Sequence, residues 1–113
     1  MTVREITVQD LQALGSSARV IDVREPHEWD DVHIAHAELV PLATVPDRVE
    51  AFDGEPTYVV CRSGNRSGKA CEFLDAQGRD VVNVAGGMLA WLAAGFPTEP
   101  NSTTAADSGP AGG

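Results

Sequence analysis

Short apolar segments alternate with helical segments along this chain, and that alternation restricts its fold more than any other feature. The apolar segments occupy residues 19–23, 37–42, 57–60 and 81–84. The clearest of them, Thr57-Tyr58-Val59-Val60, consists entirely of β-branched and aromatic residues, which favour strands. Strands that are apolar throughout are typical of a parallel sheet that is buried on both faces. The pattern therefore predicts an α/β domain in which helices cover both faces of a parallel sheet.

Helix signals lie between these apolar segments. Thr7-Val8-Gln9-Asp10 resembles a capping box, which predicts a helix that ends before Gly15. Pro26 is placed to start a helical turn that runs through Trp29. Further helices are predicted over residues 44–52, over residues 67–77, and from Gly86-Gly87 to Gly95.

The length of the chain and the composition of its C-terminal part define the expected domain. A chain of 113 residues fits one domain. From Thr98 onward the residues are mainly Asn, Ser, Thr, Ala, Gly and Pro, which cannot bury enough apolar surface to order themselves. We therefore expect a domain over residues 1–97 and a flexible, low-complexity tail over residues 98–113, whose removal leaves stability and activity intact.

The charge of the chain excludes some partners and marks one segment. A net charge of −9, from 17 acidic and 8 basic residues, argues against nucleic acid and anionic membranes as partners. No apolar run approaches the roughly 20 residues that cross a bilayer, and the N-terminus lacks the apolar segment of a secretion signal, so we expect a cytoplasmic protein. The segment 56–71 contains no acidic residue, yet Arg62, Arg66 and Lys69 lie there around Cys61.

Cys61 is the candidate catalytic residue because it directly follows a predicted strand. Ligands of parallel sheets bind at the carboxyl ends of the strands. The following loop contains Gly64 and Asn65, which adopt left-handed backbone conformations readily, so the loop can curl and turn its N–H groups inward as an anion cradle. These donors and the arginines lower the pKa of a thiol from about 8.5. We predict a nucleophilic thiolate in an electropositive, partly exposed setting. The residues predicted to bind its substrate are Arg62, Ser63, Gly64, Asn65, Arg66 and Ser67.

The remaining polar and cysteine residues carry weaker signals. The alternative for Cys61 is a small buried hydrophobe at a strand end, although such a cysteine does not usually precede a loop with two arginines. Cys71 shares a helical face with apolar residues, which favours a core position over a resolving cysteine. Asp22 is expected either to support the active loop through a hydrogen bond or to pair with an arginine. Two cysteines without CxxC spacing and three histidines in no common ligand pattern predict no disulfide scaffold, no metal site and no cofactor.

The segment Cys61–Ser67 resembles the active-site loop of the rhodanese family of sulfurtransferases. Residues 21–29 resemble the first signature of that family, residues 86–97 resemble its C-terminal signature, and the likeness extends over about residues 4–97. Within residues 32–37, however, the glycines and the proline of the family's second signature are replaced. The resemblance implies a rhodanese-like fold over the predicted domain, with a five-stranded parallel sheet and helices on both faces.

By the same resemblance, Cys61 takes up sulfane sulfur as a persulfide. Arg62 and Arg66 would steer or bind a small anionic donor such as thiosulfate. The acceptor would be cyanide in an assay, and a thiol or a sulfur-carrier protein in a cell.

Two other functions fit the same fold. Cysteine-dependent phosphatases and arsenate reductases hold an oxyanion in a Cys-x5-Arg loop, whereas Cys61 and Arg66 have a Cys-x4-Arg spacing. The shorter loop has a smaller ring of backbone N–H groups and favours sulfur over phosphate. The other alternative is a rhodanese-like module that only binds partners, but such modules commonly lose the cysteine that this chain retains.

Overall fold

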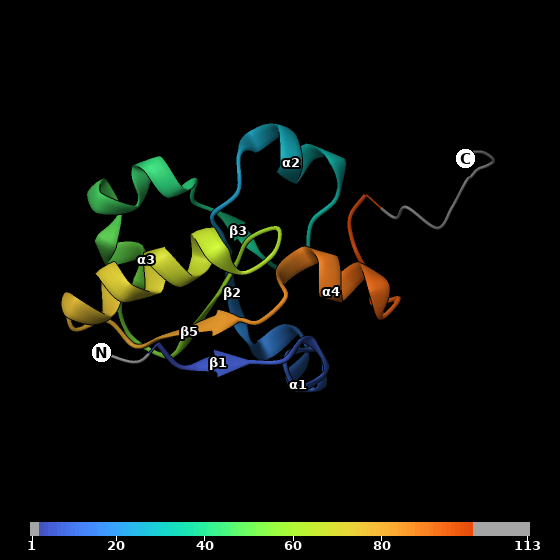
Figure 1. Cartoon of the computed structure of the whole chain (residues 1–113), viewed down its shortest axis with the longest axis horizontal. Helices are drawn as coiled ribbons and strands as arrows, with labels where there is room; N and C mark the ends of the chain where they lie inside the picture. The colour runs from blue at the N-terminus through green and yellow to red at the C-terminus, as the bar shows by residue number, and fades with distance from the viewer. Residues whose placement is uncertain (1–2, 101–113) are drawn as a thin grey trace.

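Five parallel strands form the centre of the protein (Figure 1), seen in a computed structural model that describes residues 3–100. The strands are β1 (Glu5–Ile6), β2 (Arg19–Asp22), β3 (Glu38–Leu39), β4 (Thr57–Val60) and β5 (Val81–Val84). Their order across the sheet is β1-β5-β4-β2-β3, so β4 lies in the middle with β5 and β2 on either side. The predicted fold, a five-stranded parallel sheet with helices on both faces, is confirmed.

Helices cover the two faces of this sheet. They are α1 (Val8–Leu14), η1 (Gly15–Ser17), α2 (Pro26–Asp31), η2 (Leu42–Asp47), η3 (Val49–Phe52), α3 (Asn65–Ala76) and α4 (Gly87–Ala93), where η denotes a 3₁₀ helix. None of the helices within residues 3–100 has both the length and the apolar character needed to cross a lipid bilayer.

Neighbouring residues of the central strands point to opposite faces and build two separate cores. Val59 packs in a buried cluster with residues of α3, η2 and η3, whereas Val60 packs in a second cluster with residues of α1 and α4. β2 alternates in the same way, with Ile21 in the first cluster and Val20 in the second. Because both faces are covered, an uninterrupted apolar strand is the stable solution, as the sequence pattern predicts.

Several local predictions can be compared with the structure. The Thr7 side chain accepts a hydrogen bond from the backbone N–H of Asp10 at 3.1 Å, which confirms the predicted N-terminal cap of α1. The single helix predicted over residues 44–52 is wrong, because the structure has two 3₁₀ helices that meet at Arg48. Pro46 lies inside the first of them and has no N–H to donate, which works against a continuous α-helix.

The domain continues past Pro97, where the sequence predicts its boundary. The backbones of Glu99 and His33 exchange two hydrogen bonds of 2.7 Å, and Thr98 is 8% exposed. Thr98 and Glu99 therefore contact the rest of the domain. The rest of the predicted tail, residues 101–113, lies outside the described residues.

Candidate active site

Cys61 lies immediately after β4, at the edge of the sheet where the carboxyl ends of the parallel strands meet. The chain then turns and enters α3 at Asn65, and this turn lies beside the start of α4 (Figure 1). A positive φ of 104° at Gly64, the residue before α3, allows the sharp turn, because residues with a side chain rarely adopt that conformation. The fold thus places the cysteine where parallel sheets bind ligands.

Hydrogen-bond donors surround the sulfur of Cys61. The backbone N–H of Gly64 donates to Sγ at 3.1 Å, and the hydroxyl oxygen of Ser67 lies 3.3 Å from Sγ. Burial raises the pKa of Cys61, but the Ser67 hydroxyl and the backbone N–H groups of Ser67, Gly64 and Ser63 outweigh it, so the pKa lies below its ordinary value. The loop therefore favours the thiolate.

The sulfur lies deeper than the sequence suggests. Cys61 is 1% exposed, whereas a partly exposed thiol was expected. Arg62, Ser63 and Asn65 of the same loop are exposed. The Gly64 N–H and the Ser67 hydroxyl lie against the sulfur, so the groups that favour the thiolate also cover part of it.

The start of α4 supports the loop from the side. The N–H of Met88 donates to the carbonyl of Cys61 at 2.8 Å, and the N–H of Leu89 donates to the carbonyl of Arg62 at 2.9 Å. This approach requires glycine at position 87, because a Cβ on Gly87 would lie 2.3 Å from the Cys61 carbonyl oxygen. Gly86-Gly87 thus starts α4 and also allows α4 to lie close to the active loop.

Arg66 forms an ion pair with Glu28 of α2. Its guanidinium donates to both carboxylate oxygens, at 2.8 and 2.9 Å. The pair lowers the pKa of Glu28 to about 2, and the bond to Glu28 raises the pKa of Arg66. Such bidentate pairs fix the orientation of both planar groups, so Arg66 ties the first turn of α3 to α2.

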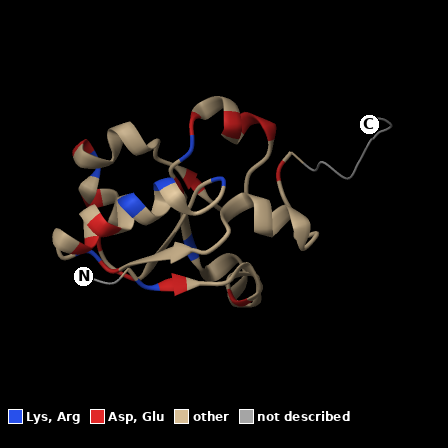
Figure 2. Cartoon of the chain, in the orientation of Figure 1, with Lys and Arg blue, Asp and Glu red and all other residues tan. Residues whose placement is uncertain are grey.

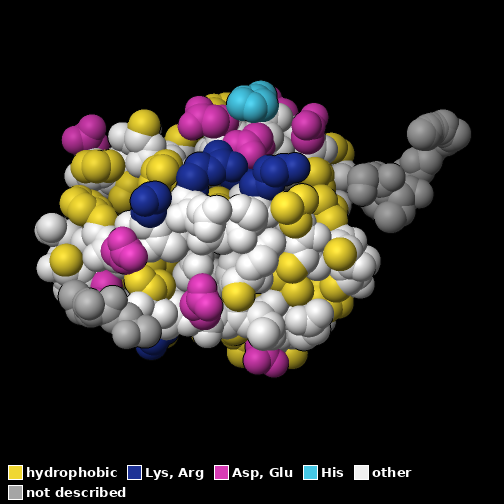
Figure 3. All heavy atoms as spheres, viewed as in Figure 1, with side chains coloured by type: hydrophobic (Ala, Val, Ile, Leu, Met, Phe, Trp, Pro, Cys, Tyr) yellow, Lys and Arg dark blue, Asp and Glu magenta, His cyan; other side chains and the backbone are white. Residues whose placement is uncertain are grey.

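The two loop arginines differ in their partners. Arg62 is exposed and forms no ion pair within residues 3–100, whereas Arg66 is held by Glu28. Basic residues lie on α3 and the loop before it, and acidic residues lie on the neighbouring α2 (Figure 2). On the face in Figure 3 the basic side chains gather in a row bordered by acidic ones. Arg62 is therefore the loop cation best able to meet an incoming anion.

The second cysteine lies in the core. Cys71 is fully buried in the cluster between α3 and the sheet, and burial raises its pKa to about 12. The pKa of Cys61 is therefore lower, and the pKa of Cys71 higher, than the pKa of an ordinary cysteine.

We expect iodoacetamide to label Cys61 at least about 100-fold faster than Cys71 at pH 7. A tenfold change in thiolate follows each pKa unit, and the weaker nucleophilicity of low-pKa thiolates offsets only part of that difference. Because the folded pKa of Cys61 is depressed, its labelling rate should approach its plateau at a lower pH than that of an ordinary cysteine, as peptide mass spectrometry across a pH series can show. Equal labelling of both cysteines in the folded protein would contradict the thiolate assignment.

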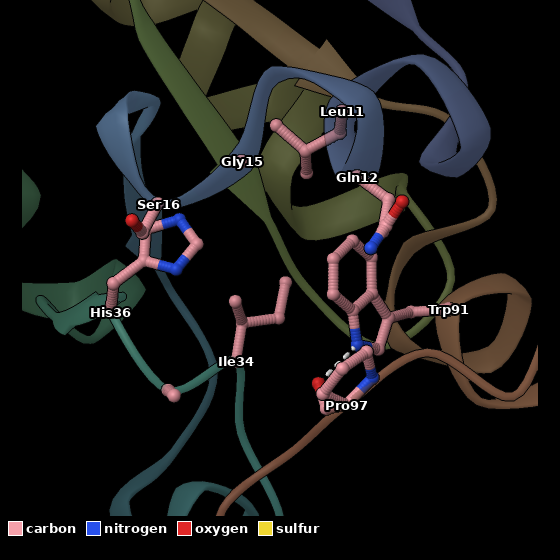
Figure 4. A pocket seen from close by; sticks show the side chains of 9 residues that line it. Leu11, Gln12, Gly15, Ser16, Ile34, His36, Trp91 and Pro97 are labelled. Atoms are coloured by element: carbon pink, nitrogen blue, oxygen red, sulfur yellow. Dashed lines mark hydrogen bonds between the residues drawn. The ribbon is translucent and has the colours of Figure 1, made fainter.

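An apolar pocket lies away from the thiol (Figure 4). Leu11, Ile34, Trp91 and Pro97 contribute to its walls, and its volume is about 170 Å³. The indole N–H of Trp91 donates to the Pro97 carbonyl at 2.9 Å. None of the residues that line this pocket belongs to the active loop.

Known proteins resemble the chain over most of its length. The family described as Rhodanese-like domain matches residues 7–94. The chain belongs to the rhodanese family.

Among the relatives of this chain, the putative sulfurtransferase YtwF of Bacillus subtilis (strain 168) is 38% identical over 95 residues, which cover 80% of this chain and 92% of that protein. Thiosulfate sulfurtransferase GlpE of Pseudomonas putida is 38% identical over 84 residues, which cover 73% of this chain and 76% of that protein. The crystal structure of a rhodanese-like domain protein from Staphylococcus aureus superposes with a TM-score of 0.75 at 41% identity, covering 79% of this chain and 91% of the other. Proteins named sulfurtransferases are thus similar to this chain in sequence, and the family likeness extends to its structure.

Asp22 forms an ion pair with Arg24. Its buried carboxylate accepts from the Arg24 backbone N–H at 3.0 Å and from the guanidinium at 2.8 to 3.0 Å. Arg24 also donates to the carbonyl of Val32 at 2.7 Å, which ties the end of β2 to the segment after α2. No hydrogen bond joins the Asp22 side chain to the active loop within the described part of the chain, so its structural role is to hold Arg24.

Two polar residues contact the active loop although the sequence did not predict it. Glu28 lies 38 positions before Arg66 in the sequence, so their spacing alone could not predict the contact between them. Asn83 interrupts the apolar strand β5, is 4% exposed, and hydrogen-bonds both Gly64 and Ser67. A buried amide within an otherwise apolar strand was the available signal for Asn83, because such a group needs hydrogen-bond partners.

Proposed function

We propose that this rhodanese is a sulfurtransferase that carries sulfane sulfur on Cys61 as a persulfide. The observation that supports this most is the ring of donors around Cys61 Sγ, which favours a thiolate without a neighbouring histidine base. The relatives named sulfurtransferases support the same chemistry.

Thiosulfate is the proposed small anionic donor. The Cys61 thiolate attacks the outer sulfur of thiosulfate, a new sulfur–sulfur bond forms, and the bond to the sulfonate sulfur breaks. Sulfite leaves with the bonding electron pair, and the enzyme retains a persulfide anion. The backbone N–H groups of Ser63, Gly64 and Ser67, which favour the thiolate, are placed to stabilise that anion as well.

A thiophilic acceptor then removes the outer sulfur. Cyanide in an assay, or a thiol or sulfur-carrier protein in the cell, attacks the outer sulfur of the persulfide, and the bond to Cys61 Sγ breaks. The electron pair returns to Sγ, so the thiolate is regenerated. The cycle requires a reduced cysteine, which suits the reducing conditions of the cytoplasm, where we place this protein.

The direct test of this function is thiocyanate formation from thiosulfate and cyanide, measured by absorbance of the iron–thiocyanate complex. We expect turnover that depends on both substrates and on the folded protein. If no thiocyanate forms and thiosulfate leaves Cys61 unmodified, thiosulfate is not the donor. The donor would then have to be a protein-bound persulfide. If Cys61 takes no sulfur from such a donor either, the proposed sulfurtransferase function is wrong.

Replacing Arg62 with alanine is expected to raise KM for thiosulfate at least about fivefold, because one exposed charge contact is worth about 1 kcal/mol or more towards a dianion. Added salt should raise the wild-type KM in the same direction. Arg79→Ala removes the same charge from a residue that lies just before β5, at the amino ends of the strands and away from the active loop. This variant should leave KM unchanged. A KM that responds to neither Arg62→Ala nor salt would contradict recognition of the donor through its charge.

A further inference from the structure

Asn83 is a buried polar residue on a strand that is otherwise apolar. Its side chain lies beside β1 and β4, since Asn83 is in register with Glu5 on one side and Val59 on the other. It is 4% exposed, and its neighbours Val82 and Val84 are buried as well. A buried amide is costly unless its donors and its acceptor find partners, so its hydrogen bonds show what it does.

Within residues 3–100, all the hydrogen bonds of this side chain lead to the active loop or to Glu5. The carbonyl oxygen accepts from the Ser67 hydroxyl at 2.5 Å. The NH₂ group donates to the Gly64 carbonyl at 3.2 Å and to the Glu5 carboxylate at 3.0 Å. Gly64 and Ser67 are the same residues whose backbone N–H and hydroxyl lie 3.1 and 3.3 Å from Cys61 Sγ.

We propose that Asn83 is a positioning residue of the sulfur site, because its one side-chain amide holds both Gly64 and Ser67 against Cys61. It touches no sulfur itself and acts through these two residues. Ser67 lies on α3 and Gly64 in the turn before it, so a fixed point on the sheet sets the distance of both from the sulfur.

Glu5 determines which way the amide points. Two acceptors, the Gly64 carbonyl and the Glu5 carboxylate, face one end of the amide, so that end must be the NH₂ group. The other end is then the carbonyl oxygen, which cannot donate, so the short contact to Ser67 uses the single hydroxyl proton. The Ser67 hydroxyl also lies 3.3 Å from Cys61 Sγ, so the sulfur and the amide oxygen share one proton, and an acceptor stronger than the amide oxygen would take more of it from the sulfur.

Asn83→Asp tests this arrangement. A carboxylate has nearly the same shape as the amide, but both of its ends accept, so it cannot bond the Gly64 carbonyl and draws the Ser67 proton away from the sulfur. We expect the pH at which iodoacetamide labels Cys61 at half its plateau rate to rise by about one unit, so that labelling below that pH is about tenfold slower than in the wild type. A wild-type labelling rate in this variant would overturn the proposal.

The matched control is Val82→Ala on the same strand. It removes buried apolar volume and should lower stability in urea, but it should leave the labelling rate of Cys61 unchanged. Equal slowing in Val82→Ala and Asn83→Asp would show that any weakening of β5 disturbs the thiol, and would overturn a specific role for the amide.

A new carboxylate could also act on the thiolate through its charge alone. In a Ser67→Ala background, Asn83→Asp is expected to slow labelling by a smaller factor than in the presence of Ser67, because the hydroxyl through which it acts is absent. The same factor in both backgrounds would show an effect of charge only and would contradict positioning.

If Asn83→Asp does not fold, the pair Glu5→Gln with Asn83→Asp decides the question. The first change supplies an N–H group that can donate to the new carboxylate, but the Gly64 carbonyl remains without its amide partner. Labelling is therefore expected to stay slower than in the wild type, and a wild-type rate would overturn the proposal.

This inference rests on the proposed use of Cys61 as a thiolate, yet iodoacetamide needs no sulfur donor, so a failure of labelling and a failure of sulfur transfer are separate results.

Discussion

Replacing Cys61 with serine is expected to reduce thiocyanate formation from thiosulfate by roughly 10³-fold or more, because the hydroxyl is a far weaker nucleophile and cannot carry sulfane sulfur. Serine can still accept the hydrogen bonds of Gly64 and Ser67, so the loop and the fold should persist. The measurement compares initial rates at saturating donor and confirms folding by circular dichroism and urea unfolding.

Cys71→Ala is the control for this substitution. Cys71 lies in the core and its thiol is held protonated, so its removal should lower stability while sulfur transfer continues. Sulfur transfer at the wild-type rate by Cys61→Ser, or loss of transfer in a folded Cys71→Ala variant, would show that Cys61 is not the cysteine that carries the sulfur.

The second large effect concerns the size of the active loop. We expect no measurable hydrolysis of aryl phosphates by the unmodified protein, since the Cys-x4-Arg loop is too short to face every oxygen of a phosphate with a donor. Inserting one glycine between Gly64 and Asn65 should reduce sulfur transfer about 100-fold, because loss of a single well-placed donor costs about 10²–10³ in rate. The insertion would move the Gly64 N–H, which lies 3.1 Å from Sγ, away from the sulfur.

An insertion of one glycine between Asp53 and Gly54 is the matched control. Gly54 lies in an exposed turn where a side-chain Cβ would meet no heavy atom within 4 Å, so this insertion should leave transfer unchanged. Hydrolysis of an aryl phosphate through Cys61, combined with failure to form a persulfide, would instead support the phosphatase alternative.

Local chemistry explains why much of this fold could be predicted from the sequence. β4 lies over the predicted residues, Thr57–Val60, because its β-branched and aromatic residues suit a strand buried on both faces. Cys61 and its loop could be located from the strand that precedes them and from Gly64, which has the positive φ that the turn requires. By contrast, β1 has only two residues and no apolar alternation, so the residue pattern does not reveal it.

Contacts between distant segments account for what the sequence did not predict. The bidentate bond between Arg66 and Glu28 gives Arg66 a contact that the sequence did not predict, which anchors α3 to α2 while Arg62 remains exposed. The link from Asn83 to Gly64 and Ser67 depends on the register of β5 beside β4. Neither partner choice follows from spacing, because each depends on how the folded elements approach one another.

The central claim is that Cys61 accepts sulfur, and mass spectrometry of the protein after incubation with thiosulfate tests it most directly. The protein is freed of thiosulfate, treated with iodoacetamide, digested and mapped by peptide. The account predicts one added sulfur atom on the peptide that contains Cys61, none on Cys71, and loss of that sulfur after addition of cyanide. A Cys61 peptide that reacts with iodoacetamide but gains no sulfur from thiosulfate or from a persulfide donor would contradict it.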